Sequence, residues 1–290
     1  MKDQTIVVDG VSIRYRDSGG PGLPVLLSHG IGGSLELWGP QLEQLGPRLR
    51  LIAWDYPGHG LSAMGDQPYD IPKFARFAWR LADALGHTRM LLAGNSLGAA
   101  ISVHMAALAP QRCAGLLLAN SAALGREVLM PFRLMSIRGL GELMSKPGPA
   151  SLQRQIAAIV RDPGVVGPEL RQVIARNDGK PGGGKAFLAT LRSLTGLGGQ
   201  RPELVDTMKS MLRGLRCPVL FVHGQHDAVI PAAHSAAAHA ATPGSRLVVL
   251  DCGHTPQLEM PAEFNALLEQ MAASSSPLPA RPATETSDAQ

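Results

Sequence analysis

Residues 89–98 read Arg89-Met90-Leu91-Leu92-Ala93-Gly94-Asn95-Ser96-Leu97-Gly98, an apolar run that ends in a Gly-x-Ser-x-Gly pentapeptide. A helical pattern follows over residues 99–109, so the pentapeptide is predicted to form a sharp turn between a buried strand and a helix. A serine on such a turn takes strained backbone angles, and the residues two places before and after it must lack a Cβ because the strand and the helix crowd them. The pattern makes Ser96 a candidate nucleophile, with a tight structural turn as the alternative.

Outward from this turn, apolar runs and helical patterns alternate along the chain. The apolar runs lie at residues 24–28, 51–54, 115–119, 218–222 and 246–250, and the helical patterns lie roughly at residues 37–49, 71–85, 97–109, 232–241 and 262–272. Continuous apolar strands separated by helices are typical of a parallel sheet that helices cover on both faces. Residues 5–8 and 11–16 differ, because they flank Asp9-Gly10, a dipeptide that favours a tight hairpin. The sequence thus predicts an α/β fold whose mostly parallel sheet has antiparallel strands at one edge.

One gap interrupts the alternation. The strand ending near Ala119 and the strand starting at Pro218 are much farther apart than the dozen or so residues that a crossover needs. We therefore expect residues 123–210 to form a helical cap over the carboxyl edge of the sheet, inserted into a core of residues 1–122 and 211–273. Residues 274–290, with their serines and prolines, are expected to form a disordered tail.

The activation of a serine hydroxyl near neutral pH needs a base within reach and an acid that orients the base. His254 follows the last strand, and Asp227 follows the strand before it. Because the carboxyl ends of parallel strands lie along one edge of a sheet, we expect Ser96, Asp227 and His254 to meet there. A helix-capping aspartate and a satisfied loop histidine are the structural alternatives for the two partners, but the joint pattern favours a catalytic triad.

Acyl transfer also needs hydrogen-bond donors for the developing oxyanion. The backbone N–H of Leu97, directly after the serine, is the first candidate. The second is the N–H of Ile31 in Ser28-His29-Gly30-Ile31-Gly32-Gly33-Ser34, where the glycines allow the backbone to fold back toward the serine. A plain glycine-rich loop between a strand and a helix is the alternative.

The composition narrows the classes of partner. The chain has 290 residues and a net charge of +4, but its arginines are scattered and only 4% of its residues are aromatic, which argues against a nucleic-acid surface. No segment approaches the roughly 18 to 20 apolar residues that span a bilayer, so no membrane partner is expected. Met1-Lys2-Asp3-Gln4 has no apolar run of the signal-peptide type, so we expect a cytoplasmic protein. Monomer and homodimer both stay open.

Metal and cofactor sites are not indicated by the sequence. Cys113, Cys217 and Cys252 are an odd number of cysteines without metal-type spacing, which argues against a disulfide framework. No spacing of histidines or carboxylates suggests a set of metal ligands. His59 is expected to be structural, and His223 has no supporting context for a role. We therefore expect a small-molecule substrate that is handled without a cofactor.

Several stretches together resemble the α/β-hydrolase superfamily. They are residues 29–33, similar to its oxyanion loop; residues 55–62, similar to a turn after a strand; residues 94–98, similar to its nucleophile elbow; and residues 227–231 and 253–259, similar to its acid and histidine loops. The order Ser, Asp, His along the chain is also that of the superfamily. The resemblance covers roughly residues 5–272 and implies a mostly parallel eight-stranded sheet flanked by helices, with a helical cap inserted after strand six.

The resemblance implies a serine hydrolase that cleaves carboxylic esters of small, largely apolar substrates through an acyl-enzyme. Asn95 and residues 120–125 are also similar to the meta-cleavage-product hydrolases, which break C–C bonds, although Thr255 stands where those enzymes often carry an aromatic residue. Enol-lactonases share the same triad. A non-catalytic ligand sensor with a vestigial triad is an alternative of another class.

Substrate contacts are expected beside the serine, on the oxyanion loop and in the cap, at Gly30, Gly32, Asn95, Met130 and Met135. Apolar cap residues such as Leu129, Phe132 and Met144 are further candidates for an acyl pocket, with ordinary core packing as the alternative. A cap arginine, Arg176 or Arg192, is a candidate partner for a substrate carboxylate, with a solvated helix face as the alternative.

Overall fold

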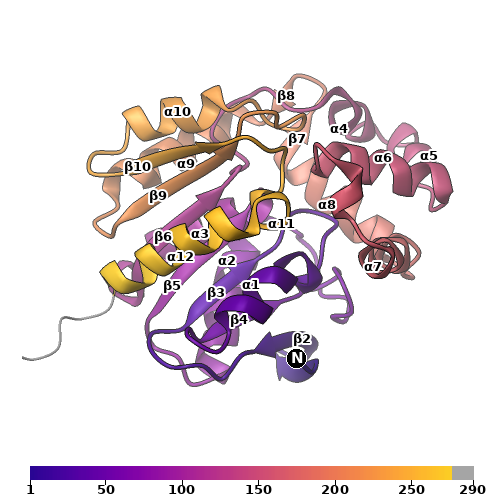
Figure 1. The fold of residues 1–290 in the computed structure, drawn as a ribbon. Helices are drawn as coiled ribbons and strands as arrows, with labels where there is room; N and C mark the ends of the chain where they lie inside the picture. Colours follow the sequence, from indigo (N-terminus) through magenta and orange to yellow (C-terminus); the bar gives the residue numbers. More distant parts are fainter. Residues whose placement is uncertain (276–290) are drawn as a thin grey trace, which may run out of the picture.

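The computed structural model describes residues 1–275, and an eight-stranded sheet forms its centre (Figure 1). Its strands are β1 (Gln4–Val8), β2 (Val11–Asp17), β3 (Val25–Ser28), β4 (Leu51–Trp54), β5 (Met90–Asn95), β6 (Cys113–Ala119), β9 (Val219–Gly224) and β10 (Arg246–Leu250). They lie in the order β1-β2-β4-β3-β5-β6-β9-β10. β1 and β2 form the predicted hairpin and β2 is antiparallel to β4, while the other neighbouring pairs are parallel. The predicted sheet is confirmed.

Helices cover both faces of this sheet. One face carries α2 (Ile71–Ala84), α3 (Leu97–Leu108), α9 (Pro202–Gly214) and α10 (Ala233–Ala240), and the other carries η1 (Leu35–Trp38), α1 (Gly39–Leu45) and α12 (Pro261–Ser275). The short helices η2 (Pro110–Arg112) and α11 (Pro256–Glu259) lead into β6 and α12. Alternate residues of a strand point to opposite faces, so Leu92 is buried on the α3 side while Leu91 and Ala93 are buried on the α12 side. This two-sided burial explains the unbroken apolar runs of the parallel strands.

The segment between β6 and β9 is built mainly of helices. They are α4 (Met130–Met135), α5 (Leu140–Met144), α6 (Pro149–Ile159), η3 (Pro163–Val165), α7 (Pro168–Asp178) and α8 (Gly183–Leu194), followed by a short ladder of β7 (Thr195–Gly196) and β8 (Gly199–Gln200). Figure 1 shows α4 to α8 gathered beyond one end of the sheet. The predicted helical insertion after strand six is confirmed, and it is called the cap below.

Two predicted boundaries differ from the structure. The cap boundary at residue 210 falls inside α9, whose Met208 and Leu212 lie in the same buried cluster as α3. The pattern of an amphipathic helix does not tell which layer buries it, so the predicted boundary divides α9 between the cap and the core. Residues 274 and 275, predicted to belong to the tail, lie in α12, which continues through Ser275. The rest of that tail, residues 276–290, lies outside the described residues.

The turn between β5 and α3 has the strained geometry that its sequence predicts. Ser96 has φ of 56° and ψ of −114°, in the positive-φ region that residues other than glycine seldom adopt. A Cβ on Gly94 would lie 2.2 Å from the carbonyl carbon of Gly98, and a Cβ on Gly98 would lie 2.0 Å from the carbonyl oxygen of Ser28. The two glycines thus allow the close approach of strand and helix that holds Ser96 at the edge of the sheet.

Candidate active site

Ser96 stands where β5 meets α3, at the carboxyl end of the parallel strands. Its N–H donates to the carbonyl oxygen of Ala119 at 2.9 Å, and its own carbonyl oxygen accepts from the N–H of Ala122 at 3.1 Å. The end of β6 therefore fixes the backbone of the turn. The serine is nearly buried, with 6% of the residue exposed, and it borders a cavity.

Asp227 and His254 come from the loops after β9 and β10 and are in direct contact. His254 Nδ1 lies 2.8 Å from Asp227 Oδ2. Because a carboxylate only accepts, Nδ1 carries the hydrogen, and Nε2 of the neutral ring is left as an acceptor. The Asp227 side chain is fully buried, and its Oδ1 accepts from the N–H groups of Val229 at 2.7 Å and Ile230 at 3.0 Å. These bonds hold the carboxylate in one orientation.

Asn120 and His223 complete the contacts of this carboxylate. Asn120 Nδ2 donates to Asp227 Oδ2 at 2.7 Å, and His223 Nε2 lies 3.2 Å from the same oxygen. Burial by itself raises the pKa of Asp227, but the charge of His254 and the hydrogen bonds from His223, His254 and Asn120 outweigh burial and hold that pKa well below its usual range. Asp227 is therefore an anion at neutral pH, suited to stabilise a positive charge on His254.

The loop that carries His254 is fastened on two sides. Asn95 Nδ2 donates to the carbonyl oxygen of His254 at 2.9 Å. Thr255 Oγ1 donates to the carbonyl oxygen of Ile159 at 2.8 Å, which ties the loop to the end of α6 in the cap. Asn95 borders the cavity, where the sequence predicted a substrate contact, but its amide N–H is engaged by the histidine loop.

Ser96 and His254 border the same cavity, which has a volume of about 450 Å³. Its walls come from residues 30–34 of the loop after β3, which is called the oxyanion loop below, and from the cap helices α4, α6, α7 and α8. Most of its lining is apolar and includes Leu37, Phe132, Met135, Ile174, Phe187 and Val229. A cavity of this size and character suits a small, largely apolar ligand.

The oxyanion loop lies against Ser96. A Cβ on Gly30 would be 3.4 Å from the Cβ of Ser96, and Gly32 has φ of 71°, a conformation that favours glycine. Gly30 and Gly32, predicted as substrate contacts, and Ile31, predicted as an oxyanion donor, all border the cavity. Within residues 1–275, the N–H groups of Ile31 and Leu97 donate no hydrogen bond, so both donors are free.

The two methionines predicted as substrate contacts differ in position. Both lie on α4, but Met135 borders the cavity, whereas Met130 is 51% exposed and does not border it. The helix turns Pro131, Phe132 and Met135 toward the cavity, and the helical repeat then carries its first residue to the outside. The prediction for Met130 is wrong for this reason.

The two cap arginines proposed as partners of a substrate carboxylate are engaged elsewhere. Arg176 Nη2 lies 3.3 Å from Glu36 Oε1, and Arg192 Nη1 lies 2.8 Å from Glu142 Oε1. Neither arginine borders the cavity. The alternative interpretation, a role on the helix face, fits both.

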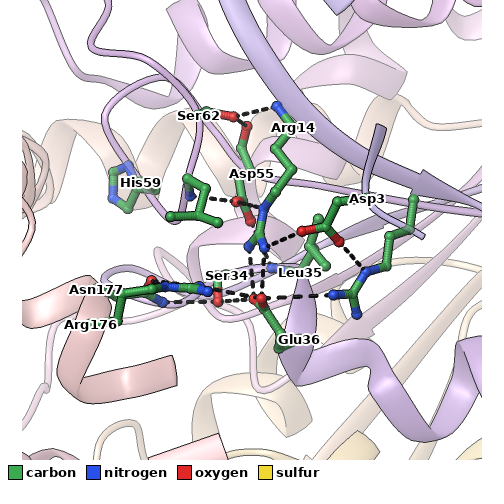
Figure 2. Close-up of polar contacts among 12 residues, drawn as sticks. Asp3, Arg14, Ser34, Leu35, Glu36, Asp55, His59, Ser62, Arg176 and Asn177 are labelled. Atoms are coloured by element: carbon green, nitrogen blue, oxygen red, sulfur yellow. Dashed lines mark hydrogen bonds and ion pairs between the residues drawn. The ribbon is translucent and has the colours of Figure 1, made fainter. Parts of the chain in front are cut away.

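A buried charge cluster anchors the end of the oxyanion loop (Figure 2). Arg14 Nε donates to Asp55 Oδ2 at 2.6 Å, and its Nη1 and Nη2 donate to the two carboxylate oxygens of Glu36 at 2.7 and 2.8 Å. The Asp55 side chain is fully buried and accepts from the N–H groups of Leu35 and Leu61, both at 2.8 Å. One carboxylate thus joins β2, the start of η1 and the turn after β4.

The same cluster reaches the cap, as Figure 2 shows. Glu36 accepts from Ser34 Oγ at 2.5 Å, and Ser34 Oγ accepts from Asn177 Nδ2 of α7 at 2.9 Å. Burial raises the pKa of Glu36, but the hydrogen bonds from Arg14 and Ser34 outweigh burial and lower the pKa to about 2. The charged carboxylate therefore links the oxyanion loop to the sheet on one side and to the cap on the other.

Asp55→Asn is expected to lower the free energy of unfolding by about 3 kcal/mol, because the Arg14 guanidinium stays buried but loses a carboxylate partner. Urea titration followed by circular dichroism measures this loss. Asp83→Asn is the matched control, since Asp83 pairs with Arg112 at 2.5 Å at the surface, where the change should cost less than about 1 kcal/mol. Equal losses in the two variants would contradict a special role for the buried pair.

No local pattern in the sequence indicates the side chains that surround Asp227. Asn120 lies 107 positions before Asp227, so no local pattern connects the two residues. His223 carried one weak signal, because it continues the buried, apolar face of β9 with a polar side chain. The ion pair of Arg14 and Asp55 could not be predicted from a local pattern either, because the two residues are 41 positions apart in the chain.

Two further properties concern the described part of the chain. No group of three or more His, Cys, Asp or Glu side chains within residues 1–275 is arranged to hold a metal ion. No helix over the same range is long and apolar enough to cross a membrane.

The model of one protein family, described as alpha/beta hydrolase fold, matches residues 24–261. The chain is 31% identical over 264 residues to the dihydrolipoyllysine-residue acetyltransferase component of the acetoin cleaving system of Cupriavidus necator, covering 91% of this chain and 67% of that protein. It is 27% identical over 272 residues to the 2-hydroxymuconate semialdehyde hydrolase of Pseudomonas sp. strain CF600, covering 91% of each. A solved hydrolase from Pseudomonas aeruginosa is similar with a TM-score of 0.76 and 25% identity, covering 93% of this chain and 97% of that one.

Proposed function

The chain belongs to the alpha/beta hydrolase fold family, and from this premise we propose that it is a serine hydrolase that cleaves carboxylic esters of small, largely apolar substrates. The observation that carries the proposal is the position of Ser96 and His254 on one apolar cavity, with buried Asp227 bonded to His254. These are the nucleophile, base and orienting acid that acyl transfer through a serine requires.

The proposed mechanism uses the hydrogen bond between Asp227 and His254 and the cavity that His254 shares with Ser96. Ser96 Oγ attacks the acyl carbonyl carbon while His254 Nε2 takes its proton, and the Asp227 carboxylate stabilises the imidazolium that forms. The free N–H groups of Ile31 and Leu97 donate to the oxyanion. His254 then protonates the leaving alcohol. A water molecule, deprotonated by His254, attacks the acyl-enzyme and releases the acid and Ser96.

The second candidate function is hydrolysis of a C–C bond in a meta-cleavage product. It is supported by the similarity to 2-hydroxymuconate semialdehyde hydrolase and by Asn95 before the serine. The apolar character of the cavity favours the ester hydrolase, because within the cavity lining the cationic side chains are confined to Arg154 and Lys180, next to a much larger apolar wall.

A substrate panel separates these functions. We expect turnover of p-nitrophenyl acetate and butyrate and little bleaching of a coloured dienoate made by ring cleavage of catechol. Robust bleaching with weak ester turnover would replace the first proposal by the second. Ligand binding without turnover of any ester, lactone or dienoate would favour a non-catalytic sensor.

Met135→Ala is expected to raise the ratio of kcat/KM for an octanoate ester to that for a butyrate ester by about 3- to 10-fold, because loss of the side chain enlarges the apolar cavity. The initial rates with the two p-nitrophenyl esters measure this ratio. Met130→Ala is the control from the same helix, and its exposed side chain should leave the ratio within about 2-fold. A similar shift in both variants would mean that Met135 does not shape the acyl site.

A further inference from the structure

His223 is a polar side chain at a position that the strand pattern assigns to the apolar core. Val219 and Phe221 point to the α3 side of β9 and are buried there, and His223 is next on that face. The His223 side chain is fully buried. A buried imidazole destabilises a fold unless its nitrogens are hydrogen-bonded, so its partners indicate why a histidine is present.

The contacts of His223 determine which ring nitrogen carries a hydrogen. Nε2 lies 3.1 Å from the carbonyl oxygen of Ile230 and 3.2 Å from Asp227 Oδ2, and both oxygens only accept. Nε2 therefore carries a hydrogen that the two oxygens share. Nδ1 lies 2.7 Å from Ser235 Oγ on α10, a buried hydroxyl that donates to Nδ1 of the neutral ring. The ring is thus held between α10 and the triad acid.

We propose that His223, backed by Ser235, is a positioning residue that aims Asp227 Oδ2 at His254. The inference rests on the proposed serine-hydrolase function. Two backbone N–H groups hold Oδ1 of Asp227, whereas Oδ2 is shared among the side chains of His254, Asn120 and His223. Hydrogen bonds therefore run in series from Ser235 through His223 and Asp227 to His254, which borders the cavity.

The effect of His223 is expected in the chemical step and not in substrate binding. His223 does not border the cavity, so its replacement removes no contact with the substrate. Loss of its N–H leaves Oδ2 with fewer donors and allows the carboxylate to tilt away from His254. Misalignment of a catalytic base on this scale lowers the rate by about 10-fold or more.

His223→Phe is therefore expected to lower kcat for p-nitrophenyl butyrate by about 10-fold, with KM within about 2-fold of the parent value. His223→Gln keeps a neutral N–H donor and is expected to recover most of this loss. The matched control is His239→Phe. His239 lies on α10, and its Nδ1 contacts Ser245 Oγ, beyond the end of that helix, at 2.7 Å, in a histidine–serine pair that does not contact Asp227. This control should leave kcat unchanged. The proposal is overturned if kcat falls equally in His223→Phe, His223→Gln and His239→Phe and the loss follows the decrease in their melting temperatures.

A double variant tests whether His223 acts through Asp227. If it does, His223→Phe should cost little further activity in an Asp227→Asn background, because the carboxylate it aims is gone. An undiminished 10-fold loss in that background contradicts the proposal.

Proton NMR gives a readout that does not depend on turnover. The downfield resonance of the His254 Nδ1 hydrogen should shift in His223→Phe and stay in place in His239→Phe; an unmoved resonance in His223→Phe overturns the inference. Absence of ester turnover in the parent protein would instead contradict the proposed function, and the NMR result would still decide the role of His223.

Discussion

Ser96→Ala is expected to lower kcat/KM for p-nitrophenyl butyrate by at least about 10³-fold, because the variant has no nucleophile to form an acyl-enzyme. The remaining rate should come from the oxyanion donors and the cavity, which the substitution leaves in place. Initial rates of p-nitrophenolate release measure the effect. A fluorophosphonate that labels the parent protein should also fail to label the variant.

Ser102→Ala is the matched control for this prediction. Ser102 is a buried serine of α3, the helix that follows Ser96, and its hydroxyl donates to the carbonyl oxygen of Gly98 at 2.9 Å. Its replacement should leave kcat/KM within about 3-fold of the parent value. Turnover by Ser96→Ala near that of the parent would remove Ser96 from the mechanism and the serine-hydrolase proposal with it.

Gly98→Ala is expected to lower the free energy of unfolding by about 4 kcal/mol or more, or to prevent accumulation of folded protein. The added Cβ would lie 2.0 Å from the carbonyl oxygen of Ser28, an atom of the central β3 backbone. Neither partner is the end of a flexible side chain, so α3 or β3 must move. The midpoint of urea unfolding measures the loss of stability.

Gly184→Ala is the control, because Gly184 occupies the same second position of its helix, α8. No heavy atom lies within 4 Å of a Cβ placed there. This alanine should be neutral or should stabilise the protein by up to about 1 kcal/mol, since alanine favours the helix over glycine. Similar destabilisation in both variants would mean that helix position, and not the approach of β3, explains the glycine at 98.

The cap contacts both loops that complete the candidate site. Asn177 of α7 donates to Ser34 at the end of the oxyanion loop, and the carbonyl oxygen of Ile159 at the end of α6 accepts from Thr255 beside His254. The cap therefore contacts the loops that carry Ile31 and His254, and it also lines the cavity. A change in the position of α6 or α7 would act on all three.

The layout of the sheet could be predicted from the sequence because a strand that is buried on both faces has a recognisable pattern of neighbouring residues. Strands buried on both sides read as continuous apolar runs, and the hairpin at the edge is marked by Asp9-Gly10. The strained turn at Ser96 is indicated by Gly94 and Gly98, two residues before and after it. Asp227 and His254 could be brought to Ser96 because parallel strands end at one edge, and the contact between Asp227 and His254 agrees with that expectation.

The sequence did not predict in the same way which face of each helix packs against the rest of the protein. Met130 and Met135 share one short helix, yet one is exposed and the other borders the cavity. The pattern of α9 likewise did not show that it packs on α3 and not in the cap. A helix turns its side chains through a full circle, so its docking partner decides which of them are buried.

The sequence by itself determined the order of strands and helices along the chain and the glycines on either side of Ser96, because both depend on neighbouring residues. It also indicated the three residues proposed for the triad, because each follows a strand that ends at the same edge of the sheet. Only the tertiary structure brought Asn120 and His223 to Asp227, joined Arg14 to Asp55 and Glu36, and turned Met135 toward the cavity while Met130 faced outward. Those contacts join separate elements, and hydrogen bonds and ion pairs form only within about 3 to 4 Å. Small differences in helix rotation and strand register therefore determine whether these contacts form. The spacing of residues along the chain does not indicate the helix rotation or the strand register.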